Sequence, residues 1–144
     1  MRTLAKNEII HFVSALIGAV VFYFFTHNFS QSIILIFVAL FIDVDHLIDY
    51  CIYLKHSKKV FSFSYFLAGK YFHAQNRMYV FFHAWEYVLI LLTFSLAGWG
   101  SLYGAIAAGL SIHYIVDTLT NNVTVDTYLL SVRIMQKFRL KTFS

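Results

Sequence analysis

The sequence predicts an all-α integral membrane protein: a four-helix transmembrane bundle with a C-terminal interfacial amphipathic helix. Of its 144 residues, 60% are hydrophobic and only 12% are charged, whereas a soluble domain carries about 25% charged residues. Four apolar stretches approach the ~20 residues that a helix needs to cross a bilayer. The chain contains no proline, so no helix is interrupted by that residue.

These stretches divide a single transmembrane domain, residues 1–144. We expect spans at about 8–25, 32–54, 78–97 and 102–119, and the interfacial helix at about 127–140. The first apolar stretch is longer than the core of a secretory signal, and no small-residue cleavage site follows it, which predicts a retained helix. The interfacial helix is predicted because apolar residues recur there at helical spacing among basic ones. A further short interfacial helix is expected at about 65–72.

Basic residues indicate the orientation. Lys and Arg lie in the N-terminal segment, in residues 55–77 and in the C-terminal tail, while the two short turns between spans carry none. The positive-inside rule therefore places the N-terminus, the middle loop and the C-terminus in the cytoplasm. The net charge of +4 at this low charge density does not indicate nucleic acid, and the expected partner is membrane lipid. The single cysteine, Cys51, excludes an internal disulfide.

Ionisable side chains inside the apolar segments are the candidates for function. Each costs ~3 kcal/mol at membrane depth on insertion scales, so a compensating partner is expected, and a bound cation is the simplest. All of them fall in the predicted cytoplasmic halves of the four spans, and the outer halves contain none. They are His11, Asp43, Asp45, His46, Asp49, His83, Glu86, His113 and Asp117.

The spacing of these residues predicts a metal site. His113 and Asp117 are four residues apart and His83 and Glu86 three apart, so each pair shares one face of a helix. Helix bundles present metal ligands as such histidine–carboxylate pairs. Imidazole and carboxylate suit zinc, with manganese and iron as alternatives. The expected ligands are His11, Asp43, Asp45, His46, His83, Glu86, His113 and Asp117.

Three further roles are expected around this site. Glu86 or Asp43 is the candidate general base, Asp49 is expected to orient His46 or a ligand, and His73 is a candidate for the mouth of the site.

A lone His–Asp pair is also a common structural hydrogen bond, so two other interpretations stay open. One is a transporter or proton-coupled channel with a relay of carboxylates and histidines. The other is a non-catalytic membrane protein whose polar cluster fastens its helices.

The order of the motifs is similar to that of a known family. The segment Asp43-Val44-Asp45-His46, preceded by His11 and followed by His83 and His113-x-x-x-Asp117, resembles the membrane-bound metal-dependent hydrolases of bacterial inner membranes. More distantly, it looks like the all-helical zinc phospholipase C and P1 nuclease group. Two features depart from the family: Ile42 stands where the family has proline, and Phe82-His83-Ala84-Trp85-Glu86 keeps only the last histidine of a His-rich segment.

The resemblance implies a function and a location. It implies a metal-dependent hydrolase of the bacterial inner membrane in which a metal-activated water attacks its substrate. A site in the cytoplasmic leaflet suits a lipid or amphipathic phosphoester as substrate, and the basic middle loop suits an anionic headgroup.

Overall fold

The computed structural model describes residues 4–121 and 125–139, which form helices and loops without a β-strand. The helices are α1 (Leu4–Thr26), α2 (Phe29–Phe41), α3 (Val44–Ser57), α4 (Phe63–Leu67), α5 (Lys70–Gln75), α6 (Trp85–Leu96), α7 (Ser101–Thr120), the 3-10 helix η1 (Val125–Tyr128) and α8 (Leu130–Met135). Three helical segments are long and apolar enough to cross a bilayer: Asn7–Thr26, Phe29–Ser57 and Ser101–Thr120. They confirm the all-α class and indicate a membrane protein.

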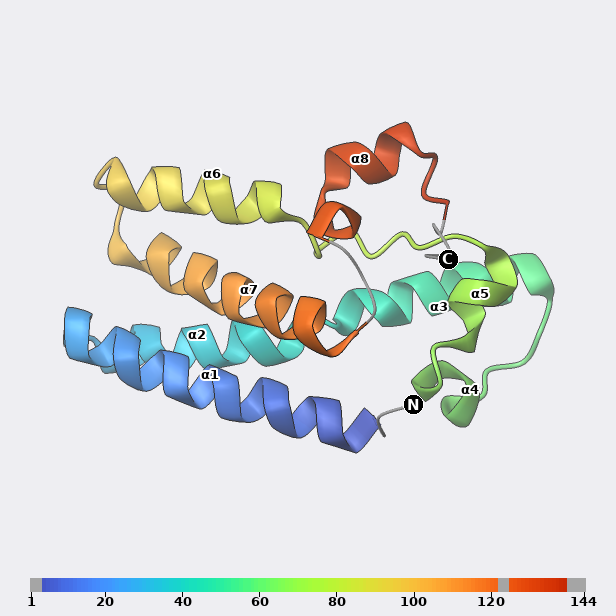
Figure 1. Ribbon diagram of the computed structural model, residues 1–144, viewed down its shortest axis with the longest axis horizontal. Helices are drawn as coiled ribbons and strands as arrows, with labels where there is room; N and C mark the ends of the chain where they lie inside the picture. The colour runs from blue at the N-terminus through green and yellow to red at the C-terminus, as the bar shows by residue number, and fades with distance from the viewer. Residues whose placement is uncertain (1–3, 122–124, 140–144) are drawn as a thin grey trace.

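Helix α7 lies at the centre of the bundle. It packs against α1, α2 and α6, and α1 also packs against α2 (Figure 1). At Gly109 the backbones of α7 and α2 approach closely, because a Cβ there would lie 2.7 Å from the Leu35 carbonyl oxygen. Small residues allow such approaches between membrane helices. The contact sets the distance between α2 and α7, which both carry site residues.

Two tight turns join the helices at one end of the bundle. Between α1 and α2, His27 adopts a left-handed backbone with a φ of 52°, and the Asn28 side chain caps α2 by accepting the Gln31 N–H at 3.1 Å. Asparagine is a favoured N-cap because its oxygen satisfies an unpaired helix N–H. Between α6 and α7, Gly98 and Gly100 have φ values of 82° and 127°, a region that favours glycine.

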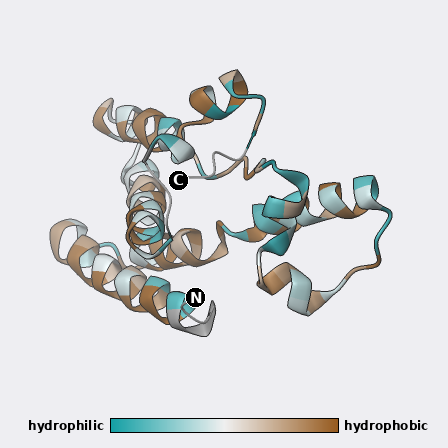
Figure 2. Cartoon of the chain, turned by 45° about the vertical axis from the view of Figure 1, so that its right-hand side comes forward, coloured by the Kyte–Doolittle hydropathy of each residue, from teal (hydrophilic) through white to brown (hydrophobic). Residues whose placement is uncertain are grey.

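The second predicted span, 32–54, is interrupted at its first carboxylate. Helix α2 ends at Phe41, α3 begins at Val44, and the turn between them is closed by the His46 N–H donating to the Asp43 carbonyl at 3.0 Å. The helices follow one another in Figure 1. In Figure 2 the part that contains α3, α4 and α5 projects sideways from the bundle. The interruption places Asp43 at the inner end of α2.

The third predicted span, 78–97, is much shorter than expected. Helix α6 has only 12 residues, about 18 Å at 1.5 Å per residue, so it is too short to cross the ~30 Å hydrocarbon core. Residues 77–84 are not helical. The structure therefore does not confirm a bundle of four spanning helices.

The peripheral helices are also shorter than the sequence predicts. The expected helix at 65–72 is two helices, α4 and α5, which pack on each other. The expected interfacial helix at 127–140 is η1 followed by the six-residue α8, and residue 140 lies outside the described part of the chain. Tyr50 and Tyr53 of α3 and Tyr71 of α5 form a buried aromatic cluster that holds α4 and α5 against α3.

Candidate metal centre

Helix α7 contributes one pair of side chains to a buried polar cluster. His113 and Asp117 lie one turn apart, as their spacing predicts, and the His113 Nε2 is 3.3 Å from the Asp117 Oδ2. Only 1% of the His113 side chain and 8% of the Asp117 side chain are exposed. Both face the inside of the molecule because α7 is enclosed by α1, α2 and α6.

Asp43 enters the cluster from the turn between α2 and α3. Its Oδ1 lies within hydrogen-bonding distance of three imidazole nitrogens: 3.1 Å from the His46 Nε2, 3.2 Å from the His83 Nε2 and 3.3 Å from the His113 Nε2. Asp43 lies in the short break between α2, which ends at Phe41, and α3, which begins at Val44.

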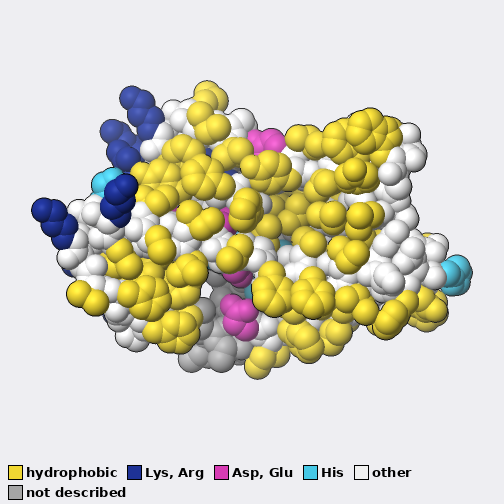
Figure 3. Space-filling model, turned by 180° about the vertical axis from the view of Figure 1, so that it is seen from behind, with side chains coloured by type: hydrophobic (Ala, Val, Ile, Leu, Met, Phe, Trp, Pro, Cys, Tyr) yellow, Lys and Arg dark blue, Asp and Glu magenta, His cyan; other side chains and the backbone are white. Residues whose placement is uncertain are grey.

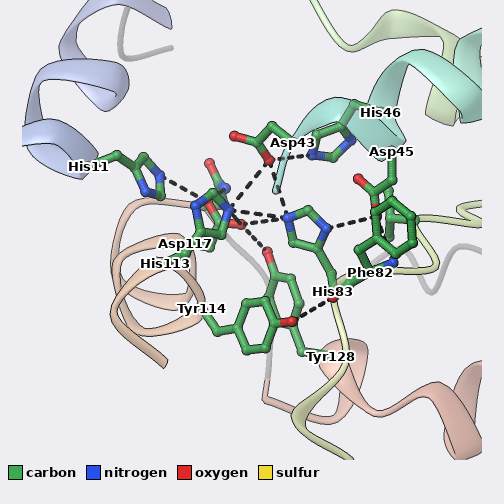
Figure 4. A network of polar contacts seen from close by, with 12 residues as sticks. His11, Asp43, Asp45, His46, Phe82, His83, His113, Tyr114, Asp117 and Tyr128 are labelled. Carbon is green, nitrogen blue, oxygen red and sulfur yellow. Dashed lines mark hydrogen bonds and ion pairs between the residues drawn. The ribbon is translucent and has the colours of Figure 1, made fainter. Parts of the chain in front are cut away.

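His83 comes from the non-helical segment 77–84. Its Nε2 lies 3.1 Å from the Nε2 of His113 and 3.7 Å from the Asp117 Oδ2. Four potential ligand atoms, one each from Asp43, His83, His113 and Asp117, all lie within 4.8 Å of one another. Figure 4 shows their side chains pointing toward a common centre. This buried group of two histidines and two aspartates could bind a metal ion.

The hydrogen bonds of the Nδ1 atoms determine the orientation and the tautomer of His83 and His113. The His113 Nδ1 lies 2.8 Å from the Ala39 carbonyl oxygen, and the His83 Nδ1 lies 3.0 Å from the Asp45 Oδ2. Because both partners only accept hydrogen bonds, each neutral ring carries its proton on Nδ1. This is how ligating histidines are oriented in metal sites, and it turns both Nε2 lone pairs toward the cluster.

The inner atoms are therefore all acceptors. Two imidazole lone pairs and two carboxylate oxygens would repel one another at these distances unless a cation lies between them. Nitrogen and oxygen ligands of this kind suit zinc, manganese and iron. These four potential ligand atoms thus fit a divalent metal ion. A proton shared among these groups is the alternative cation.

A second layer of side chains holds Asp117. The Tyr128 hydroxyl donates to its Oδ2 at 2.8 Å, and the Asn121 amide donates to its Oδ1 at 2.9 Å. The His11 Nε2 lies 3.2 Å from the same Oδ1, and the His11 ring stacks on that of His113 with centroids 4.4 Å apart. His11 therefore touches the cluster from α1 and lies outside the group of four.

Asp45 and His46 lie on the other side of His83. Asp45 is buried, and its Oδ2 accepts both the His83 Nδ1 proton and the Phe82 N–H, the latter at 2.8 Å. Together with His83, these two residues form a second group of possible ligand atoms. Because the His83 Nδ1 already faces Asp45, we assign Asp45 to orienting His83.

The structure does not bring Glu86 to the cluster. The Glu86 carboxylate accepts the Leu130 N–H at 3.0 Å and the Ser131 N–H at 2.9 Å, so it caps α8. Burial raises the pKa of Glu86, but these hydrogen bonds outweigh it and lower the pKa to about 2. The predicted roles as ligand and general base assumed a helix running through residues 83–86, whereas α6 begins only at Trp85.

Asp49 and His73 also differ from expectation. Asp49 accepts the Gln75 amide at 2.8 Å and the Tyr79 N–H at 3.0 Å, so it anchors the start of the segment 77–84 and does not orient His46. His73 is exposed on α5. Neither residue is part of the groups of possible ligands.

Side chains from distant helices stabilise the segment that carries His83. Irregular backbone at membrane depth needs such partners because no water is there to replace them. Asp45 and Asp49 accept N–H groups of this segment. The Tyr114 hydroxyl accepts the Ala84 N–H and donates to the Phe82 carbonyl, and Arg133 donates to the carbonyls of Tyr79, Val80 and His83.

Sequence reasoning missed four of the supporting residues: Tyr114, Asn121, Tyr128 and Arg133. The interfacial helix predicted at 127–140 implies a surface position for Arg133, but only 5% of it is exposed. One signal was available for two of them, because Tyr114 directly follows His113 and Asn121 is four residues after Asp117 in the sequence. Nothing local in the sequence indicates the contacts of Tyr128 and Arg133.

The cluster reaches the surface on the side of Asp43 and His46. Their side chains are 33% and 28% exposed, whereas His83 and His113 are almost fully buried. Val44 and Leu47, next to the opening in the sequence, are exposed apolar residues.

No family model, curated protein or solved structure matches this chain. The resemblance to membrane-bound metal-dependent hydrolases therefore remains a prediction from the motifs.

Proposed function

We propose that this chain is a metal-dependent membrane hydrolase that acts on a phosphoester or lipid-like substrate. The observation that carries the proposal is the convergence of the Nε2 atoms of His83 and His113 with carboxylate oxygens of Asp43 and Asp117. Both imidazoles are fixed from behind with their lone pairs inward. Zinc is our first choice of metal, and manganese and iron accept the same ligands.

The residues divide into holding and proton-transfer roles. His83, His113, Asp117 and Asp43 would hold the metal, which supplies a Lewis acid and an activated water for hydrolysis. Asp43 is also the candidate general base, through the carboxylate oxygen that does not hold the metal, because its side chain is partly exposed and lies beside His46. His46 can take the proton onward from Asp43, since it lies at the opening of the cluster. Glu86 has no part in the reaction.

An amphipathic substrate suits the surroundings of the opening. Exposed Val44 and Leu47 flank Asp43 and His46 along α3, so a substrate with an apolar part can approach while its polar group meets the cluster. Under the positive-inside rule, the opening belongs to the cytoplasmic leaflet. The bacterial inner membrane is the location that the family resemblance implies.

The first test is the metal content of the detergent-purified protein, measured by elemental mass spectrometry. We expect about one equivalent of zinc, manganese or iron in the wild type and its loss in His113→Ala and Asp117→Asn. His73→Ala is the matched control, because it removes an exposed histidine of α5 and should keep the metal. Absence of metal from the wild type after reconstitution with each ion would reject the proposed centre.

Activity is tested separately with a chromogenic phosphodiester and short-chain phospholipids in mixed micelles. We expect hydrolysis by the metal-loaded wild type, loss in Asp43→Asn and retention in Glu86→Gln. A metal-loaded protein that hydrolyses none of these substrates, but moves protons in proteoliposomes, would replace the hydrolase by the transporter interpretation.

A further inference from the structure

All Lys, Arg, Asp and Glu residues in the segment from Tyr50 to Trp85 are basic. It contains Lys55, Lys58, Lys59, Lys70 and Arg77, and no Asp or Glu. In Figure 3, Lys and Arg side chains gather at the end of the molecule that carries α3, α4 and α5. The segment therefore presents a positive surface that complements an anionic partner.

A shallow pocket lies where α3 is joined to α4. Its volume is about 180 Å³, and it is lined by Tyr50, Tyr53, Lys59, Val60, Ser62 and Tyr65. The Lys59 Nζ lies 5.7 Å from the centroids of both the Tyr53 and the Tyr65 rings, and the hydroxyls of these tyrosines are 3.3 Å apart. The pocket thus combines an ammonium group with two phenol hydroxyls, which together can bind a phosphate oxygen.

Hydrogen bonds hold the pocket in shape. The Tyr50 hydroxyl accepts the Ser62 N–H at 3.0 Å and donates to the Ser62 carbonyl at 3.2 Å. This pair fixes the loop that carries Lys59 against α3. The neighbouring Tyr53 hydroxyl raises the pKa of the Lys59 amine above its ordinary value, and a lysine is charged at neutral pH in any case.

The same loop exposes large apolar side chains. Val60, Phe61 and Phe63 are 89%, 51% and 64% exposed. Such exposure is costly in water, and apolar side chains beside lysines are typical of segments that lie in the interfacial region of a bilayer. The outward face of α3, with Val44, Leu47 and Ile48 exposed, places a second apolar strip on the helix that leads to this loop.

We propose that the pocket around Lys59, Tyr53 and Tyr65 binds the phosphate headgroup of an anionic phospholipid, while Val60, Phe61 and Phe63 enter the interfacial region. The apolar loop selects a lipid over a free anion, and the surrounding lysines favour an anionic lipid over a zwitterionic one. This site does not depend on the proposed metal centre.

Lipid binding is tested by native mass spectrometry of the purified protein titrated with short-chain phosphatidylglycerol or phosphatidylcholine. We expect phosphatidylglycerol to bind and Lys59→Ala to weaken that binding about fivefold, the effect of one lysine near an anionic surface. Lys137→Ala, which removes an exposed lysine beyond α8, is the control and should bind as the wild type does. Equal binding by wild type and Lys59→Ala would overturn the proposal.

Two further measurements separate the lipid from other occupants. Inorganic phosphate should not displace phosphatidylglycerol, and displacement at matched concentration would show a phosphate site instead. A fluorophore on Val60→Cys, in a Cys51→Ser background because Cys51 is exposed, should be quenched by spin-labelled lipid in nanodiscs. Quenching by aqueous iodide but not by spin-labelled lipid would show that the loop does not enter the bilayer. Metal content should be unchanged in Lys59→Ala, so failure here leaves the metal centre untouched.

Discussion

Single hydrogen bonds determine how the ligands of the cluster are oriented, and the bond between Asp45 and His83 can be tested directly by mutation. Asp45 fixes the His83 proton on Nδ1 at 3.0 Å and so turns the Nε2 lone pair inward. In Asp45→Asn the negative charge that favours this tautomer is lost. We expect metal affinity to fall about 10–100-fold, the usual effect of losing such an outer partner, as measured by competition with a calibrated chelator.

The control for Asp45→Asn is His56→Ala, since His56 is exposed on α3 and its ring hydrogen-bonds to the Ile52 carbonyl, away from the cluster. Its metal affinity should equal that of the wild type. Unchanged affinity in Asp45→Asn would mean that His83 needs no help to present Nε2.

Glu86 belongs to stability, and its contribution depends on pH. The folded-state pKa of about 2 lies below the ordinary glutamate value of 4.5, so the stabilisation is present above pH 4.5 and is lost as the pH falls toward 2. Glu86→Gln should lower the free energy of unfolding near neutral pH by about 1 kcal/mol, as for the loss of a helix cap. Partial exposure screens part of the charge effect.

Thermal melting of the purified protein across this pH range checks the Glu86 prediction. The difference between wild type and Glu86→Gln should shrink as the pH falls below 4.5, while Glu8→Gln, at an exposed position of α1, should show little difference at any pH. Loss of bound metal in Glu86→Gln would instead indicate that Glu86 is a metal ligand.

At the scale of elements, the predictable parts are those that local pattern determines. Helices α1 and α7 follow from apolar length alone, and the His113–Asp117 pair follows from helical spacing within α7. The sequence of segment 77–84 is as apolar as that of a spanning helix. Its backbone groups nevertheless hydrogen-bond to Asp45, Asp49, Tyr114 and Arg133. These partners are distant in sequence, so no local pattern could show that they replace the helical hydrogen bonds.

Arg133 is the strongest single tie between α8 and that segment. Arg133→Met would leave the buried carbonyls of Val80 and His83 without their donor. We expect a loss of roughly 1–3 kcal/mol of stability and weaker metal binding, because His83 loses its support. Arg133→Lys should recover part of both, since a lysine keeps the charge without the planar fork.

Chemical denaturation in detergent and metal content measured on the same samples check the Arg133 prediction. Lys137→Met is the control, as Lys137 lies beyond α8 and is exposed. If Arg133→Met unfolds at the same denaturant concentration as the wild type, then the segment 77–84 is held by the other side chains alone.

For the whole molecule, the distribution of charge predicts its orientation in the bilayer. Basic side chains gather at the end that carries α3, α4 and α5, and the opposite end shows none in the view of Figure 3. The turns at 27–28 and 98–100 lie at that opposite end of the bundle (Figure 1). Because Lys and Arg favour the cytoplasmic side, we expect the opening at Asp43 and His46 to face the cytoplasm.

Cysteine labelling decides the orientation. In a Cys51→Ser background, Trp99→Cys replaces a residue that is 66% exposed in the turn between α6 and α7, and Lys55→Cys replaces an exposed residue of α3. A membrane-impermeant maleimide should label Trp99→Cys in intact cells and Lys55→Cys only after lysis. The reverse pattern would place the opening at Asp43 and His46 in the outer leaflet, and any substrate would then have to be supplied from outside the cell.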